Sequence, residues 1–272
     1  MAQSNNSIKK ILTVAFALCI VCSIIVSTAA VALRSKQQLN QELDRKTNIL
    51  AVAGLYEPGD DIKEAFEQIT PRVVDLRTGE YTDQFDAEKY NSFQAAKDPA
   101  QSRTLSGEKD IAGLSRQENY STVYLVGDPD DPEQVILPIR GQGLWGLMRG
   151  YLAVQGDGNT IEGITFYSHS ETPGLGGEVD NPRWKAQWEG KEIFADADSA
   201  QPAIALVKGG ASEETEVDAL SGASLTSKGV TNLLQFWLSP EGFGEYLARF
   251  RNDIAREEVQ DASTDSDQTE GA

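Results

Sequence analysis

The chain has 272 residues, a formal net charge of −18 at pH 7 and one histidine. An acidic balance of this size argues against nucleic acid as a partner, because phosphate backbones are bound by basic surfaces. The single His169 allows no convincing catalytic triad and no zinc site built on histidines, so we interpret it as a loop residue. The sequence also lacks a phosphate loop and a dinucleotide-binding glycine motif.

An uncharged apolar run extends from Ile11 to Leu33. A helix of this length crosses the hydrocarbon core of a bilayer, which is about 30 Å thick. Secretory signal peptides have a shorter apolar core, so we predict a retained anchor at 11–33, with cleavage near residues 27–30 as the alternative. Lys9 and Lys10 favour a cytoplasmic segment 1–10 and a domain on the opposite side of the membrane.

Both cysteines, Cys19 and Cys22, lie inside this apolar run. The rest of the chain therefore has no disulfide and no thiol ligand. We interpret the pair as small packing residues, and a metal shared with a partner protein is the alternative.

Residues 34–118 are predicted to form a stalk and a peripheral segment. The stretch 34–52 has a polar helical pattern, and 60–67 is expected to form a short helix. A strand is predicted at 73–77. Residues 82–118 contain few large apolar groups, so we expect a surface excursion with short helical pieces.

Residues 119–251 are predicted to form the compact domain. Two hairpins and a later strand are expected, with strands at 122–126, 134–139, 151–154, 161–167 and 204–208. The loop 169–177 contains a proline and three glycines, which exclude regular structure. Helices are expected at 181–188 and, after the segment 242–244, through Arg249. An acidic tail at 252–272 is expected to be disordered. Hairpins followed by short helices indicate an α+β fold of antiparallel strands with flanking helices.

A hydroxyl-rich segment precedes one further amphipathic helix. The helix is indicated by a stripe at helical spacing, formed by Val230, Leu233, Leu234, Trp237 and Leu238. Four hydroxyl side chains lie just before the stripe, at Ser221, Ser224, Thr226 and Ser227. Such residues usually cap a helix. A helix N-terminus also binds phosphate, because its N–H groups are unpaired and the helix dipole is positive there.

Glycine-rich loops and aromatic residues suggest a planar ligand. Glycine allows the backbone to approach a flat ring, and aromatic side chains can cover the ring's faces. Core packing is the simpler interpretation of Phe166 and Trp184, whereas Trp145 lies within a glycine loop and fits either role. From the residues alone, the chain is a membrane-anchored domain with a candidate site for a planar phosphorylated cofactor.

Several stretches, in order along residues 7 to about 250, carry a resemblance to one family. They are Ser7-Ile8-Lys9-Lys10, Val21-Cys22-Ser23-Ile24-Ile25-Val26-Ser27, Val135-Ile136-Leu137-Pro138, Gly143-Leu144-Trp145, Glu171-Thr172-Pro173-Gly174-Leu175-Gly176-Gly177-Glu178, Val207-Lys208-Gly209-Gly210, and Asp218-Ala219-Leu220-Ser221-Gly222-Ala223-Ser224-Leu225-Thr226-Ser227. The chain resembles the C subunit of the sodium-translocating NADH:quinone reductase. The acidic tail lies outside the resemblance.

The resemblance implies a covalent FMN carrier. In that family a flavin transferase joins FMN through a phosphoester to the last residue of an Asp-x-x-Ser-Gly-Ala-Thr motif. Here the motif is matched by Asp218, Ser221, Gly222 and Ala223, with Ser224 where threonine is usual. Motif position favours Ser224 as the acceptor, and residue type favours Thr226. The resemblance assigns Asp218 to recognition by the transferase or to the transferase's metal.

Other site residues and partners follow from the same resemblance. Thr172, Leu175 and Gly176 match the loop around the flavin ring, and Trp145 is expected near that ring. Lys208 is expected to balance the charge of the phosphate or the reduced ring, or else to be a solvated turn lysine.

The domain is expected on the periplasmic side of a bacterial inner membrane, where it relays electrons between redox centres of neighbouring proteins in the complex. NADH is expected to bind to another member of the complex. The alternatives are the G subunit of the ferredoxin-linked Rnf complex, which is also a flavin carrier, and a cofactor-free anchored scaffold protein.

Overall fold

The computed structural model describes residues 8–196 and 199–252, and the chain divides into two units between Lys46 and Thr47. Helix α1 (Ile8–Val52) makes up the described part of the first unit and continues into the second. Its segment Ile8–Arg34 has 27 residues, a mean hydropathy of 2.6 and no buried part, so it is long and apolar enough to cross a membrane. The predicted span 11–33 lies within it, and the prediction of a helical stretch at 34–52 is confirmed.

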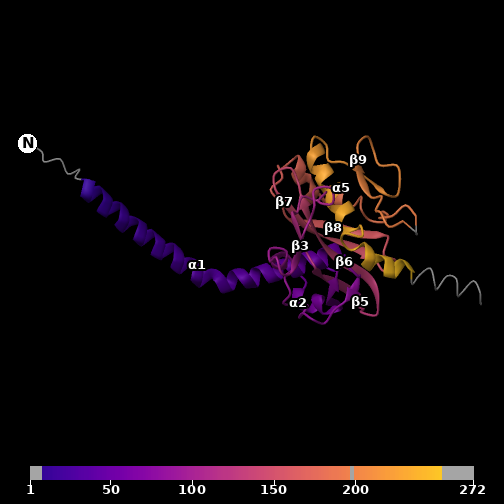
Figure 1. The fold of residues 1–272 in the computed structure, drawn as a ribbon, viewed down its shortest axis with the longest axis horizontal. Coiled ribbons are helices and arrows are strands. Elements are labelled where there is room, and N and C mark those ends of the chain that lie inside the picture. The colour runs from indigo at the N-terminus through magenta and orange to yellow at the C-terminus, as the bar shows by residue number, and fades with distance from the viewer. Residues whose placement is uncertain (1–7, 197–198, 253–272) are drawn as a thin grey trace, which may run out of the picture. The chain divides into compact units, whose positions relative to one another are not determined.

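The second unit is built on a six-stranded antiparallel sheet (Figure 1). The strand order is β2-β1-β5-β6-β7-β8. The strands are β1 (Ile69–Asp75), β2 (Glu80–Tyr81), β5 (Tyr120–Asp128), β6 (Asp131–Gln142), β7 (Leu147–Gln155) and β8 (Ile161–Ser168). Both predicted hairpins are present, as β5–β6 and β7–β8. The α+β prediction is therefore confirmed.

Alternating side chains place an apolar core on each face of the sheet. On β5, Val123 and Leu125 enter the larger core, whereas Tyr124 and Val126 enter the smaller one. This period of two is the expected consequence of a pleated strand whose two faces are both covered.

The two cores are covered by helices from opposite ends of the chain. Helix α5 (Ser224–Trp237) packs against β6 and closes the larger core (Figure 1). Ile49 and Leu50 at the end of α1 close the smaller core, together with α2 (Ile62–Ala65) and the short helix η1 (Phe66–Gln68).

Strands β1 and β2 come from the segment that the sequence analysis assigned to stalk and periphery. The compact unit runs from Thr47, and β1 pairs with β5 along its whole length. The excursion 82–118 contains the predicted helical piece α3 (Ser92–Ala95). It also contains an unpredicted hairpin of β3 (Ser102–Thr104) and β4 (Arg116–Glu118). These strands are short and mostly polar, so they lack the apolar alternation that marks longer strands.

The remaining elements surround the hydroxyl-rich segment. Strand β9 (Ala205–Val207) lies within the predicted strand 204–208. It pairs in parallel with β10 (Glu216–Asp218), a strand that the sequence did not indicate. The loop after β8 contains η2 (Gly176–Asp180) and is followed by α4 (Pro182–Lys185). Residues 244–252 form the last described helical segment. The predicted acidic tail lies outside the described residues from 253 onward.

Candidate functional site

The hydroxyl-rich segment forms the turn that leads into α5. The N-cap residue of α5 is Ala223, which has no side-chain capping hydrogen bond, so the predicted hydroxyl cap is not at this position. Ser227 stabilises the turn from inside the helix instead. Its hydroxyl donates to the carbonyl of Ala223 at 3.0 Å and accepts the N–H of Leu220 at 3.0 Å. Ser221 and Gly222 are exposed in the turn.

The two candidate acceptor hydroxyls have opposite environments. Ser224 is the first residue of α5 and is exposed. Thr226 is 0% exposed, and its hydroxyl donates to Oε2 of Glu171 at 2.5 Å. Ser224 is therefore accessible to a large ligand, whereas Thr226 is part of the packed interior.

The spacing of the apolar stripe on α5 predicts this difference in burial between Thr226 and Ser224. Thr226 precedes Val230 by four residues and Leu233 by seven, so it continues the buried stripe toward the helix N-terminus. Ser224 lies two residues earlier, about 200° away around the helix axis. Extending the stripe backward would have separated the two hydroxyls from the sequence alone.

Glu171 connects three segments: its own loop, the loop of Trp145 and the first turn of α5. Its side chain is 5% exposed, and its Oε1 accepts the backbone N–H of Trp145 at 3.0 Å. Its other oxygen accepts the hydroxyl of Thr226 on α5. The sequence alone gives Glu171 no role, because its partners are 26 and 55 residues away in the chain.

Four exposed apolar side chains are carried by these three segments. Trp145 is 66% exposed and Leu225 is 62% exposed, and Leu144 and Leu175 are also exposed. Leu175 lies against the turn before α5, since a Cβ atom on Gly222 would be 3.1 Å from its Cδ2 atom. Exposed apolar groups on segments that are joined in this way indicate a surface that contacts a ligand or another protein.

The loop expected around the flavin ring is closed by its own backbone. The carbonyl of Thr172 accepts the N–H groups of Leu175 at 3.1 Å and Gly177 at 2.9 Å. Gly176 is buried at a close approach to α5, where a Cβ atom would be 2.5 Å from Oγ1 of Thr226. Thr172 and Leu175 are exposed, so the loop presents both side chains outward.

His169 fixes the start of this loop. Its Nδ1 atom accepts the N–H of Glu171 at 3.2 Å, and its Nε2 atom lies 2.8 Å from Oδ2 of Asp180. With Nδ1 accepting, the proton of a neutral ring is on Nε2, which donates to Asp180. His169 is therefore a structural loop residue, as predicted.

Asp218 and Lys208 belong to the parallel pair β9–β10. Asp218 pairs in register with Val207, the residue before Lys208. The Asp218 carboxylate accepts the N–H of Ala211 at 2.6 Å, and its carbonyl accepts the indole N–H of Trp184 at 2.9 Å. Asp218 thus holds the turn 208–210, on which Lys208 is exposed.

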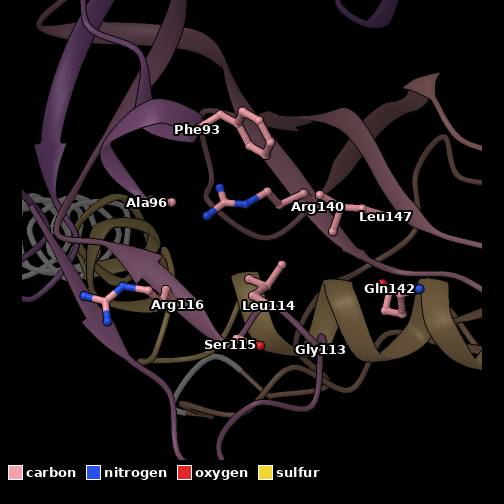
Figure 2. A pocket seen from close by; sticks show the side chains of 9 residues that line it. All are labelled: Phe93, Ala96, Gly113, Leu114, Ser115, Arg116, Arg140, Gln142 and Leu147. Carbon is pink, nitrogen blue, oxygen red and sulfur yellow. The ribbon is translucent and has the colours of Figure 1, made fainter. Parts of the chain in front are cut away.

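A further pocket of about 390 Å³ lies among α3, the turn 113–116 and the facing ends of β6 and β7 (Figure 2). The guanidinium group of Arg140 extends between Phe93 and Leu114. Arg140 is paired with Glu118, and Arg116 donates to Ser102 and Thr104. The carboxylate of Glu118 therefore offsets the charge of Arg140, whereas Arg116 is held by neutral oxygens.

Comparison with known proteins defines first the class and then the family. Residues 143–239 match the family described as "FMN-binding domain", and this range contains the loops, Glu171 and α5. The chain is 51% identical to the C subunit of the Na(+)-translocating NADH-quinone reductase of Vibrio anguillarum, over 93% of this chain and 98% of that protein. It is 47% identical to the protein of the same name from Pseudomonas aeruginosa, over 91% of this chain and 98% of the relative. The chain belongs to this family, the C subunits of the sodium-translocating NADH-quinone reductase.

Solved structures agree with this assignment. The crystal structure of Shewanella oneidensis NqrC is similar with a TM-score of 0.71 and 33% sequence identity, over 78% of this chain and 99% of that one. The C subunit of the reductase from Parabacteroides distasonis is similar with a TM-score of 0.62 and 29% identity, over 79% of this chain and 96% of that one. The shared family name favours the reductase over the ferredoxin-linked alternative.

Proposed function

We propose that this chain is the membrane-anchored flavin carrier of a sodium-translocating NADH:quinone reductase, with FMN joined to Ser224 through a phosphoester. The observation that carries the proposal is the contrast on α5. Ser224 is exposed at the first helical residue, whereas Thr226 is fully buried with its hydroxyl bonded to Glu171. Esterification of Thr226 would require that bond to break and the first helical turn to open.

The residues around Ser224 suit a flavin phosphate and ring. The first turn of α5 provides unpaired N–H groups for the phosphate. Exposed Trp145, Leu144, Leu175 and Leu225 provide apolar contacts for the ring. We assign Thr172 and Gly176 to the loop beside the ring. We assign Lys208 to oppose negative charge, and support comes from Asp218, which holds the Lys208 turn next to the segment that leads into α5.

In this proposal the cofactor supplies reversible uptake of electrons, and the chain supplies placement and electrostatics. The ester leaves the ring free of covalent bonds, so ring contacts set the potential. Electrons pass between redox centres of partner proteins, and NADH binds elsewhere in the complex. The anchor keeps the carrier near its partners at high effective concentration.

We place the compact unit on the periplasmic side of the inner membrane. Lys9 and Lys10 precede the apolar segment and favour an N-terminus on the cytoplasmic side. A flavin transferase acting on this turn would meet the exposed residues Ser221, Gly222 and Ser224 there.

The experiment is production of the full chain together with a flavin transferase, followed by a denaturing gel. We expect fluorescence that stays on the band and a peptide mass increase on Ser224. Ser224→Ala should lose the fluorescence, and Thr226→Val should keep it. Covalent flavin on the Ser224→Ala variant would reject Ser224 as the acceptor. A band of the parent chain without flavin fluorescence would favour the scaffold alternative.

A further inference from the structure

We propose that Glu171 is a positioning residue that also lowers the midpoint potential of the flavin. Its carboxylate holds the Trp145 loop and the first turn of α5 together and places a fixed negative charge beside the flavin site. This inference rests on the proposed function, because it concerns the same site.

The contacts of Glu171 join the parts that would enclose the ring. One oxygen accepts the N–H of Trp145, and the other accepts the hydroxyl of Thr226, two residues after the proposed acceptor. The backbone N–H of Glu171 is bonded to His169, which is fixed by Asp180. The carboxylate is therefore held at both oxygens, and the backbone that carries it is held at its N–H, so the side chain has little freedom to turn away.

Two glycines approach this carboxylate closely. A Cβ atom on Gly143 would lie 2.6 Å from Oε1 of Glu171, and one on Gly176 would lie 2.7 Å from Oε2. Both glycines come from loops that the sequence marks as candidate flavin loops. Their lack of side chains is explained by the close approach to Glu171.

The charge of Glu171 has no cationic partner. Within the part of the chain that the structure describes, no lysine or arginine forms a salt bridge with it. Its two donors, a backbone N–H and a hydroxyl, are neutral. A buried charge that is solvated only by neutral dipoles acts on its surroundings with little screening. A negative charge beside the ring opposes the addition of electrons and so lowers the midpoint potential.

Glu171→Gln tests the charge separately from the geometry. Glutamine keeps an oxygen for the N–H of Trp145, and its amide can donate to the hydroxyl oxygen of Thr226. We expect Glu171→Gln to keep covalent FMN at the parent level. Its midpoint potential, measured by spectroelectrochemical titration of the full chain, should rise by about 59 mV for a one-electron step, a tenfold change in the redox equilibrium.

Glu178→Gln is the matched control. Glu178 lies in the same loop and is half-buried, but its carboxylate accepts the side-chain amide of Asn181 rather than groups at α5. The change in net charge is identical, so a general effect of charge would move both potentials equally. We expect the potential of Glu178→Gln to remain close to that of the parent.

Glu171→Ala tests the positioning role without flavin. It leaves the hydroxyl of Thr226 and the N–H of Trp145 without their acceptor, so the flavin-free chain should unfold at a lower temperature than both the parent and Glu171→Gln.

The outcomes separate the two proposals. A parent chain without covalent flavin defeats the proposed function and this inference with it. A flavin-loaded parent whose potential is unchanged in Glu171→Gln, or shifts equally in Glu178→Gln, defeats the potential-lowering role alone. Equal unfolding temperatures for the flavin-free parent and Glu171→Ala defeat the positioning role.

Discussion

Two buried carboxylates, Glu118 and Glu171, are held in opposite ways. Glu118 is 1% exposed and pairs with Arg140, whose Nη1 atom lies 2.7 Å from Oε1. Arg140 also lies against the Trp237 ring, with its Cζ atom 4.9 Å from the ring centroid. Glu171 is 5% exposed and is held by a hydroxyl and a backbone N–H.

The difference shows how one residue type serves structure at one position and electrostatics at another. The guanidinium group of Arg140 cancels the charge of Glu118 locally, so the pair links β4 to β6 without a strong external field. The neutral donors of Glu171 stabilise its charge but do not cancel it. Glu171 lies at the loops that carry Trp145 and Leu175, whereas Glu118 lies in the excursion hairpin.

The largest expected effect comes from breaking the Glu118 pair. Glu118→Ala leaves Arg140 charged and buried, so we expect a loss of about 3–5 kcal/mol in the free energy of unfolding. Denaturant titration of the full chain in detergent, followed by tryptophan fluorescence, measures it. The double variant Glu118→Leu with Arg140→Met removes both charges and should recover most of the loss. A single variant as stable as the parent would show that the pair does not support the fold.

A smaller loss in the free energy of unfolding is expected when Glu171 keeps its charge but loses the hydrogen bond from the hydroxyl of Thr226. Thr226→Val removes the hydroxyl and leaves Oε2 buried without that bond, which should cost about 1–3 kcal/mol. Thr226→Ser restores the hydroxyl and should recover most of the stability. The same denaturant titration compares the three proteins, and equal stability of the valine and serine variants would contradict a role for this bond.

The smallest effect on the free energy of unfolding is expected at Glu241, because its carboxylate is partly exposed. Lys109, and then Arg103 at 2.9 Å, hold the pKa of Glu241 below its ordinary value of 4.5. A lowered pKa in the folded state means that the stabilisation is complete above pH 4.5 and is lost as the pH falls through the lower folded value. Solvent screening limits the contribution to about 1 kcal/mol or less.

Glu241→Gln should reduce this pH dependence and change little above pH 4.5. The backbone carbonyl of Glu241 still accepts Arg103 and Gln117 in the variant, so the excursion remains attached. Unfolding free energies measured on both sides of pH 4.5 compare the variant with the parent. An unchanged acid profile would show that the Glu241 carboxylate does not contribute.

Local patterns in the sequence determined the anchor, the two central hairpins and α5. Each depends on residues close together in the chain: an uncharged apolar run, alternating strands around a Gly-Asp-Gly-Asn turn, and a stripe at helical period. The hydroxyl-rich segment was located in the same way. The stripe also separates Thr226 from Ser224, because residues that are two positions apart in a helix lie on nearly opposite sides.

Only the tertiary structure decided what surrounds those hydroxyls. Strand β10 and the β3–β4 hairpin are too short to carry a periodic pattern, so pairing alone reveals them. Glu171 is one of many acidic residues in the sequence, and although it begins the stretch that resembles the flavin loop, no local pattern gives it a role. Its role arises because folding brings together a loop 26 residues before it and a helix 55 residues after it. Burial and partner choice depend on those distant segments, which no local pattern encodes.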